Sequence, residues 1–329
     1  MYDRIPCAAP RPFRTRIDMQ RRPLGNTGFD VAPLALGGNV FGWTADEATS
    51  FAVLDAFVAA GGTMVDSADA YARWLGKGGG ESETILGAWI NARGNRDQVL
   101  VATKMGKLPP YDNLRPDSIR AACDDSLRRL GTDRIDLYYA HQDHLDDDLP
   151  AALEALDDLV RAGKVRHVAA SNFTATRLTE ALDLQKANGW APFVALQPHY
   201  NLVERDEYET EYADLCTERG IGTLPYFGLA RGFLTGKYRG DAQVDSVRAE
   251  GVTQYAHERG ERVLSTLHDV ADAHGVPMAA IALAWLRTRP AVVAPIASAR
   301  TVEQLVDLLP MADVVLDSDE QSALDAASA

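Results

Sequence analysis

From residue 34 onward, the hydrophobic and polar positions alternate between two kinds of segment. Short, nearly continuous apolar runs are typical of strands that are buried on both faces of a parallel sheet. Between these runs, apolar residues recur with the spacing of one helix face, which predicts amphipathic helices. The predicted strands cover residues 34–37, 63–66, 99–103, 135–140, 165–170, 193–197, 222–226 and 292–296. The predicted helices cover residues 47–60, 81–92, 116–130, 149–162, 175–188, 206–219 and 301–309.

This order of elements predicts an α/β fold, a (β/α)8 barrel (TIM barrel) rather than an open doubly wound sheet. Residues 19–36, with Gly-Asn-Thr-Gly at 25–28, predict a β-hairpin placed where it can plug one end of the barrel. Residues 227–260 are rich in glycine and predict no regular element, so we expect a long functional loop after the seventh strand. Residues 318–327 predict a short extra helix. No boundary interrupts the pattern, so residues 19–329 are predicted to form one domain.

Composition narrows the classes of function. The formal net charge of −14 disfavours non-specific binding to nucleic acid or to an anionic membrane. No apolar run reaches the length of a membrane-spanning helix. The three cysteines, Cys7, Cys123 and Cys216, lie far apart and argue against a disulfide framework or a thiolate metal site. They favour a protein of the reducing cytoplasm.

The first 18 residues differ from the rest. They contain three prolines and four arginines, without the apolar run of a signal peptide. We expect a disordered leader at residues 1–18, and Met19 is the expected natural start.

Polar residues stand where the predicted strands end. In a (β/α)8 barrel the carboxyl ends of the strands meet at one rim, and active sites lie there. An isolated polar residue would be an ordinary loop residue, but a full ring of them favours a site. The residues at this predicted rim are Asp66, Ser67, Asp69, Tyr71, Lys104, His141, Ser171, Asn172, Gln197, Tyr226, Ser298 and Arg300.

Asp, Tyr, Lys and His together indicate proton transfer to a developing alkoxide. A free tyrosine titrates near 10, and we expect the ammonium of Lys104 to lower the pKa of Tyr71. Asp66 would hold Lys104 charged and oriented, and His141 could donate to the substrate oxygen. Tyr71 would then be the general acid for reduction and the base for oxidation. Because none of these groups supplies a hydride, the chemistry requires a cofactor.

Nine sequence motifs follow one another in the order found in a known family. They are Arg-Pro-Leu-Gly-Asn-Thr-Gly at 22–28, Asp-Ser-Ala-Asp-Ala-Tyr at 66–71, Gly-Glu-Ser-Glu at 80–83, Ala-Thr-Lys at 102–104, Asp-Leu-Tyr-Tyr-Ala-His at 136–141, Ala-Ser-Asn-Phe at 170–173, Gln-Pro-His-Tyr-Asn-Leu at 197–202, Gly-Leu-Ala-Arg-Gly-Phe-Leu-Thr-Gly-Lys-Tyr at 228–238 and Glu-Gln-Leu at 303–305. With these motifs, the chain resembles the aldo-keto reductase superfamily, and more narrowly its bacterial and potassium-channel-β-like branch. The resemblance spans about residues 20 to 325.

The resemblance implies the catalytic residues Asp66, Tyr71, Lys104 and His141 and an extended NADP site, with NAD(H) as the alternative cofactor. It implies that residues after strands five and six hold the carboxamide, that Tyr226 stacks on the nicotinamide, and that residues 227–231 line the pyrophosphate. The implied cofactor contacts are Gly38, Asn39, Asp66, Ser171, Asn172, Gln197, Tyr226, Phe227, Gly228, Leu229, Ala230, Arg231, Lys237, Ser298, Arg300, Gln304 and Asp307.

Arg300 has a physical case of its own. It stands just before a predicted helix, and helix N-termini attract phosphate. A guanidinium adds a permanently charged forked donor. The alternative is a surface arginine paired with Glu303 or Asp307.

The chain departs from the family pattern at several cofactor positions. Phe227 and Gly228 replace a common Ser-Pro pair, and Ala297 and Ser298 replace Pro-Gly. The asparagine that often follows position 307 is absent, so one adenine contact is lost and NADP is preferred rather than required.

Three further interpretations concern the pocket and its function. Phe41, Trp43 and Trp74 are predicted to line a substrate pocket with Tyr71 and His141, although ordinary packing of Phe41 and Trp43 under the rim explains them equally well. The run of His and Asp residues at 141–148 suggests a metal site, and a metal-dependent hydrolase is therefore an alternative class of function. The other strand ends offer poor ligands, so no metal is predicted.

A non-catalytic NADP-binding sensor is the second functional class. Such relatives depart at the His position, whereas this chain keeps His141. The sequence indicates a small carbonyl or alcohol substrate but neither its identity nor an oligomeric state.

Overall fold

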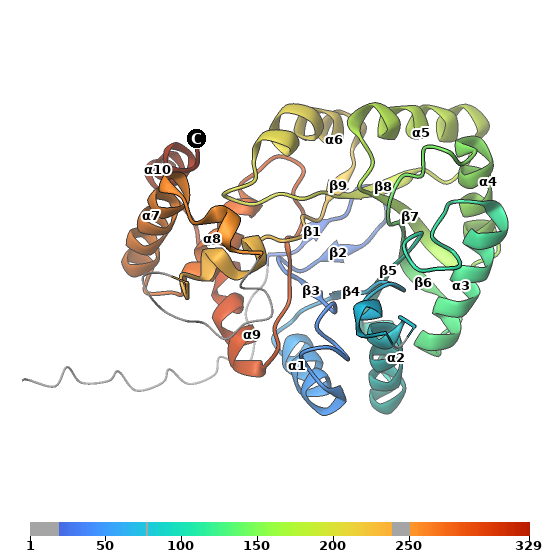
Figure 1. Ribbon diagram of the computed structural model, residues 1–329, viewed down its shortest axis with the longest axis horizontal. Coiled ribbons are helices and arrows are strands. Elements are labelled where there is room, and N and C mark those ends of the chain that lie inside the picture. The colour runs from blue at the N-terminus through green and yellow to red at the C-terminus, as the bar shows by residue number, and fades with distance from the viewer. Residues whose placement is uncertain (1–19, 77, 239–250) are drawn as a thin grey trace, which may run out of the picture.

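Eight parallel strands lie at the centre of the molecule, and helices surround them (Figure 1). The computed structural model describes residues 20–76, 78–238 and 251–329, so the predicted leader at 1–18 lies outside the described residues. The strands are hydrogen-bonded in the order β10-β3-β4-β5-β6-β7-β8-β9. Their bounds are β3 Ala35–Gly37, β4 Met64–Asp66, β5 Leu100–Met105, β6 Ile135–Ala140, β7 Val165–Ser171, β8 Phe193–Gln197, β9 Gly222–Thr223 and β10 Ile296–Ala297.

Backbone hydrogen bonds join the two ends of this sheet and close the predicted (β/α)8 barrel. The N–H of Val293 donates to the carbonyl of Thr223 over 2.9 Å, and the N–H of Ile296 donates to the carbonyl of Pro225 over 2.8 Å. The regular strands at this seam are shorter than the sequence predicts. Pro225 and Pro295 have no N–H to give to a ladder, so β9 ends early and β10 begins late.

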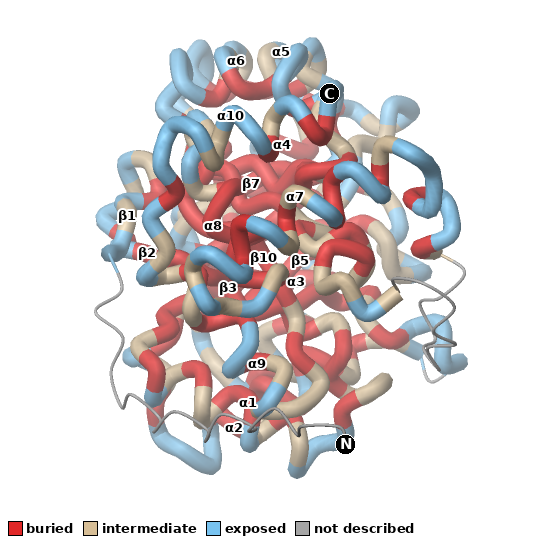
Figure 2. The backbone as a smooth tube through the Cα atoms, turned by 90° about the vertical axis from the view of Figure 1, so that its left-hand side faces the viewer, coloured by how far each residue is buried: buried red, intermediate tan, exposed pale blue. Residues whose placement is uncertain are grey.

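The helices follow their predicted positions closely up to β8. Their bounds in the described residues are α1 Glu47–Ala59, α2 Glu81–Arg93, α3 Pro116–Leu130, α4 Leu149–Arg161, α5 Ala175–Asn188, α6 Ala213–Arg219, α7 Glu258–His274, α8 Met278–Arg287, α9 Val302–Leu308 and α10 Ser318–Ser328. Gly131 and Gly189 end α3 and α5 with φ of 60° and 68°, a conformation that glycine adopts without steric cost. The helices expose their outer faces and bury their inner faces against the barrel (Figure 2).

The segment after β9 departs most from the sequence prediction. The expectation of no regular element over residues 227–260 is wrong in part. Two 3₁₀ helices, η4 at Ala230–Thr235 and η5 at Thr253–Tyr255, lie in it, and α7 begins at Glu258. The hydrophobic pattern also failed to predict α8. Nearly every α8 side chain is buried, so no polar face marks its period.

The N-terminal hairpin closes the end of the barrel opposite the rim, as predicted. Its strands, β1 Arg22–Pro23 and β2 Asp30–Val31, pair antiparallel. Leu24, Phe29 and Val31 pack in one hydrophobic cluster with side chains from the barrel interior.

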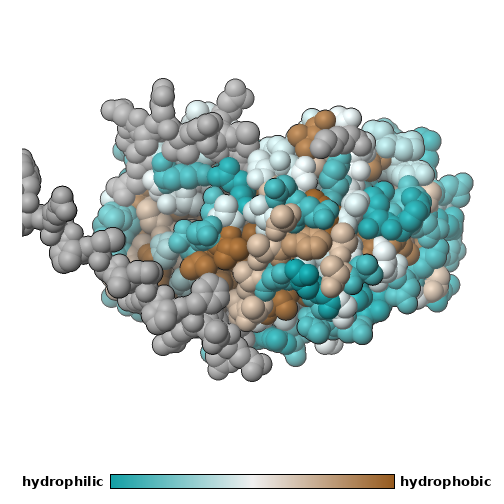
Figure 3. Space-filling model, turned by 90° about the horizontal axis from the view of Figure 1, so that it is seen from below, coloured by the Kyte–Doolittle hydropathy of each residue, from teal (hydrophilic) through white to brown (hydrophobic). Residues whose placement is uncertain are grey.

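The outer surface is mixed in character. The face in Figure 3 carries hydrophilic side chains around a central band of hydrophobic ones. Over the described part of the chain, no helix combines the length and the apolar character needed to cross a bilayer.

Candidate active site

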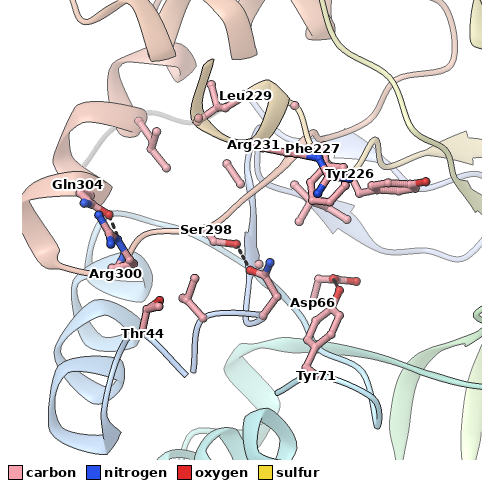
Figure 4. A pocket seen from close by; sticks show the side chains of 18 of the residues that line it. Thr44, Asp66, Tyr71, Tyr226, Phe227, Leu229, Arg231, Ser298, Arg300 and Gln304 are labelled. Atoms are coloured by element: carbon pink, nitrogen blue, oxygen red, sulfur yellow. Dashed lines mark hydrogen bonds between the residues drawn. The ribbon is translucent and has the colours of Figure 1, made fainter. Parts of the chain in front are cut away.

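A cavity of about 640 Å³ opens at the carboxyl ends of the barrel strands (Figure 4). Many of the residues predicted from the sequence line it. They are Asn39, Asp66, Tyr71, Trp74, His141, Ser171, Asn172, Gln197, Tyr226, Phe227, Gly228, Leu229, Arg231, Lys237, Ser298, Arg300, Gln304 and Asp307. Gly38, Phe41, Trp43, Lys104 and Ala230 do not line the cavity.

Asp66, Lys104 and Tyr71 form one hydrogen-bonded group at the floor of this cavity. Asp66 ends β4 and Lys104 lies on the neighbouring strand β5, so both side chains reach the same level of the barrel. The Lys104 ammonium is fully buried and donates to Asp66 Oδ2 over 2.7 Å and to Tyr71 Oη over 2.9 Å. The carbonyl of Ser67 accepts a third bond over 2.7 Å. Tyr71 Oη also donates to Asp66 Oδ2 over 3.1 Å.

The electrostatics of Tyr71 correct one expectation. The sequence argument predicts a lowered pKa, whereas burial and the carboxylate of Asp66 raise the pKa of Tyr71 above its ordinary value. Burial of the phenol is the largest cause, and the carboxylate of Asp66, which also holds the Lys104 ammonium, adds to it. Burial lowers the pKa of Lys104, and the nearby Asp66 opposes that shift. Tyr71 therefore keeps its proton firmly.

His141 lies beside this group, directly after β6. Its ring centroid is 6.3 Å from that of Tyr71, at an interplanar angle of 79°. Burial and the positive charges of Lys104, Lys107 and Arg73 hold the pKa of His141 well below its ordinary value. The ring is therefore neutral near pH 7, with one N–H to donate.

The residues after β7, β8 and β9 hold one another along one wall. Asn172 donates to the carbonyl of His141 over 2.7 Å and accepts from the Tyr226 hydroxyl over 3.0 Å. Gln197 donates to Asp66 Oδ1 over 2.9 Å. Sequence reasoning gave no role to His199, whose ring stacks on that of Tyr226 at 5.2 Å. Its position two residues past β8 was a usable signal. Hydrogen bonds therefore link the residues of this wall, and the ring of His199 packs against Tyr226.

The other half of the cavity is lined by three cations. Arg231, Lys237 and Arg300 reach it from η4, from the segment just after η4 and from the residue before α9's N-cap. Within residues 20–76, 78–238 and 251–329, none of the three pairs with a carboxylate. In the described residues, Arg300 therefore forms no ion pair with Glu303 or Asp307, which was the alternative interpretation.

A left-handed bend and a hydrogen bond across the barrel seam shape this half. The backbone passes through positive φ at Ala230, Arg231 and Gly232, with values of 46°, 58° and 100°. This bend aims the Arg231 guanidinium, which lies 4.4 Å over the ring of Phe227. Across the seam, Ser298 donates to Asn39 Oδ1 over 2.5 Å and ties the end of β10 to the end of β3.

The aromatic residues predicted to line the substrate pocket have different positions in the structure. Trp74 lines the cavity with 51% of its surface exposed, and Trp43 supports it in an edge-to-face contact at 5.1 Å. Phe41 is fully buried in the hydrophobic core, so the packing interpretation holds for it and the substrate interpretation does not.

Several cavity residues were missed by sequence reasoning. They are Gly37, Val40, Thr44, Lys107, Gly232, Thr235, Pro277, Ala279, Ile296 and Leu308. Lys107 stands two residues past β5, and that position was a signal for it, whereas Thr44 stands seven residues past β3. Pro277 and Ala279 carry no polar signal.

The histidine and aspartate run after β6 has structural partners. His144 Nε2 lies 2.7 Å from the carbonyl of Gly106, and Asp148 caps α4 by accepting from Ala151 N–H. In the described ranges, no group of three or more His, Cys, Asp or Glu residues is arranged to hold a metal ion.

A second buried carboxyl beneath the floor permits a prediction about stability. Asp69 is 1% exposed, and burial with the charge of Glu83 raises the pKa of Asp69 to about 8. The unfolded carboxyl titrates near 4, so the folded protein binds the extra proton between these values and loses stability as pH rises through them. We expect Asp69→Asn to raise the free energy of unfolding more at about pH 8.5 than at about pH 5.

Denaturation with urea at both pH values measures this difference. Asp269→Asn, at an exposed position of α7, is the matched control and should show the same small change at both. A gain for Asp69→Asn that does not depend on pH would contradict the assignment.

The comparisons with known proteins agree with this geometry. The model of the aldo/keto reductase family matches residues 33–329. Protein tas of Escherichia coli is 32% identical, over 87% of this chain and 91% of that protein. The uncharacterized oxidoreductase YrpG of Bacillus subtilis is 33% identical, over 92% and 93%. Norsolorinic acid reductase B of Aspergillus parasiticus is 31% identical, over 90% and 80%. The barrel, the arrangement at its rim and these matches together show that the chain belongs to the aldo/keto reductase family, a family of oxidoreductases.

Proposed function

We propose that this protein reduces a small carbonyl compound with NADPH and that Tyr71 is the proton donor. The observation that carries the proposal is the Asp66–Lys104–Tyr71 group at the cavity floor, with the neutral ring of His141 beside it. The reductase and oxidoreductase names of the relatives support the same class of reaction.

The cavity has the chemistry that a nicotinamide dinucleotide requires. Arg231, Lys237 and Arg300 lack carboxylate partners in the described part of the chain and suit the pyrophosphate and the 2′-phosphate. The Nε of Arg231 is buried without a hydrogen-bond partner there, which supports a bound acceptor. Tyr226 offers an aromatic face toward the nicotinamide end of the cavity. When bound, the cofactor supplies the hydride.

Each floor residue has a distinct task in the proton transfer. Tyr71 Oη donates its proton to the carbonyl oxygen as negative charge develops there. His141, kept neutral, donates its single N–H to the same oxygen and orients the carbonyl. Lys104 stabilises the phenolate that Tyr71 becomes, and Asp66 fixes the ammonium in place. With its pKa raised, Tyr71 is protonated near neutral pH, which is the form that donates a proton in reduction.

Consumption of NADPH, followed by its absorbance in the presence of simple aldehydes and ketones, tests the proposal. Turnover that depends on both the carbonyl compound and the cofactor is the expected result. Tight NADPH binding without turnover of any carbonyl would instead favour a cofactor-sensing role.

The cofactor preference gives a separate prediction. We expect Arg300→Ala to weaken NADPH binding by about tenfold to a hundredfold, the loss of one charge-assisted contact to phosphate. NADH, which lacks the 2′-phosphate, should bind almost as before. Titration of both cofactors by fluorescence measures the two dissociation constants, with Arg262→Ala on the exposed face of α7 as the control. If the variant binds NADPH and NADH more weakly by the same factor, Arg300 does not contact the 2′-phosphate.

A further inference from the structure

Lys107 is a cation in the cavity that the proposed reaction does not use. It lies on the loop after β5 and lines the same cavity as Tyr71, His141 and Trp74. The residue is half-buried, and within the described ranges its ammonium forms neither an ion pair nor a hydrogen bond. A partly desolvated charge without a counter-ion costs free energy, which a bound anion would recover.

The surroundings of Lys107 add to this positive charge. Arg73 donates through its guanidinium to the backbone carbonyl of Lys107 over 2.5 Å, which holds a second cation next to the first. Both charges reach the catalytic end of the cavity, since both lower the pKa of His141. The nearby carboxylate of Asp66 is already engaged by Lys104 and Gln197. In a chain of net charge −14, this end of the cavity is locally positive.

The cofactor does not account for Lys107. The cations suited to its phosphates come from η4, from the segment just after it and from the residue before α9's N-cap. Figure 4 shows Arg300 and Gln304 on the side of the cavity away from Tyr71. Lys107 follows β5 instead, on the side of Tyr71 and His141 where the substrate carbonyl would sit.

The same part of the cavity has an aromatic surface. Trp74 is half-exposed there and is held by its edge-to-face contact with Trp43. Trp74 and Lys107 line the same cavity, so a flat ring packed on Trp74 can carry a charged substituent toward the Lys107 ammonium.

We propose that Lys107 is a specificity residue that selects aromatic carbonyl substrates bearing a carboxylate. The carboxylate pairs with the Lys107 ammonium, the ring packs on Trp74, and the carbonyl faces Tyr71 and His141. This inference rests on the proposed reductase function, and it adds the chemical class of the substrate.

Paired substrates test the inference. The 3- and 4-formylbenzoates are compared with the 3- and 4-formylbenzamides, which have nearly the same shape but no charge. We expect kcat/KM with NADPH to favour at least one benzoate over its amide, and Lys107→Met to lower that ratio by about tenfold, between the losses seen for exposed and buried ion pairs. Lys107→Arg should restore much of the preference, and added salt should weaken it.

Lys186→Met is the matched control. Lys186 is exposed near the end of α5, at the opposite end of the barrel, and its loss changes the net charge equally. The ratio should not change in this variant. Ratios near one for both isomers, or ratios that Lys107→Met leaves unaltered, would overturn the inference while leaving the reductase function in place.

A binding experiment keeps the inference testable without turnover. Calorimetric titration of each benzoate and each amide into protein saturated with NADP⁺, which has no hydride to transfer, reports affinity directly. If a benzoate binds more tightly than its amide and Lys107→Met abolishes the difference, the result supports the site even if no aldehyde is reduced. The absence of reduction would then contradict only the proposed function. Equal affinities for benzoate and amide would overturn the inference.

Discussion

Replacement of Tyr71 by phenylalanine is expected to lower kcat for carbonyl reduction by about a hundredfold to ten-thousandfold, the usual contribution of a positioned general acid. The variant loses only the hydroxyl that bonds to Lys104 and Asp66, so the ring still shapes the cavity. Affinity for NADPH should stay nearly the same, because the cofactor cations lie on other elements. Single-turnover oxidation of bound NADPH measures the chemical step, and fluorescence titration measures the affinity.

Tyr138→Phe provides the matched control. Tyr138 lies on β6 with its hydroxyl buried and packs on the helix side of the barrel. The same chemical change there should leave reduction intact. Unchanged turnover in the Tyr71 variant, or an equal loss in both, would remove Tyr71 from the role of acid.

Replacement of Lys104 by methionine should damage both turnover and stability. The change leaves the Asp66 carboxylate buried without its ammonium, and breaking a buried pair in this way costs about 3–5 kcal/mol. Adding Asp66→Asn should recover much of the free energy of unfolding, because the uncompensated charge is gone. It should not recover reduction, because Tyr71 still lacks the cation that stabilises its phenolate.

Urea denaturation and single-turnover kinetics separate these two effects. Lys164→Met breaks an ion pair with Asp124 that is well exposed, and it should cost only about 0.2–1 kcal/mol. A loss no larger than this for Lys104→Met would show that the buried pair contributes little. Recovery of activity in the double variant would contradict the role given to Lys104.

Much of this architecture could be predicted from the sequence for a physical reason. Strands buried on both faces read as continuous apolar runs, and parallel strands of a barrel end at one rim. Asp66 and Lys104 could therefore be placed together, because each ends or lies near the end of such a run. The hairpin turn and the helix-ending glycines were equally local signals.

The remaining features depend on contacts that no local pattern encodes. The direction of the Tyr71 pKa shift depends first on burial of the phenol and then on the nearby Asp66 carboxylate, whereas the sequence prediction considered only the ammonium of Lys104. The burial of Phe41 and of most of α8 depends on what packs around them. The short β9 and β10 reflect two prolines that meet only when the barrel closes.

The bond between Ser298 and Asn39 has a consequence for biosynthesis. These residues stand 259 positions apart, yet they join adjacent strands and line the same cavity. Closing so long a loop is slow compared with forming neighbouring strand–helix units. The half of the cavity that we propose for the cofactor therefore assembles only after the ribosome has released almost the whole chain. A nascent polypeptide that stops before β10 would contain Tyr71 and Lys104 but lack Ser298 and Arg300, so the cavity would be complete only at the end of synthesis.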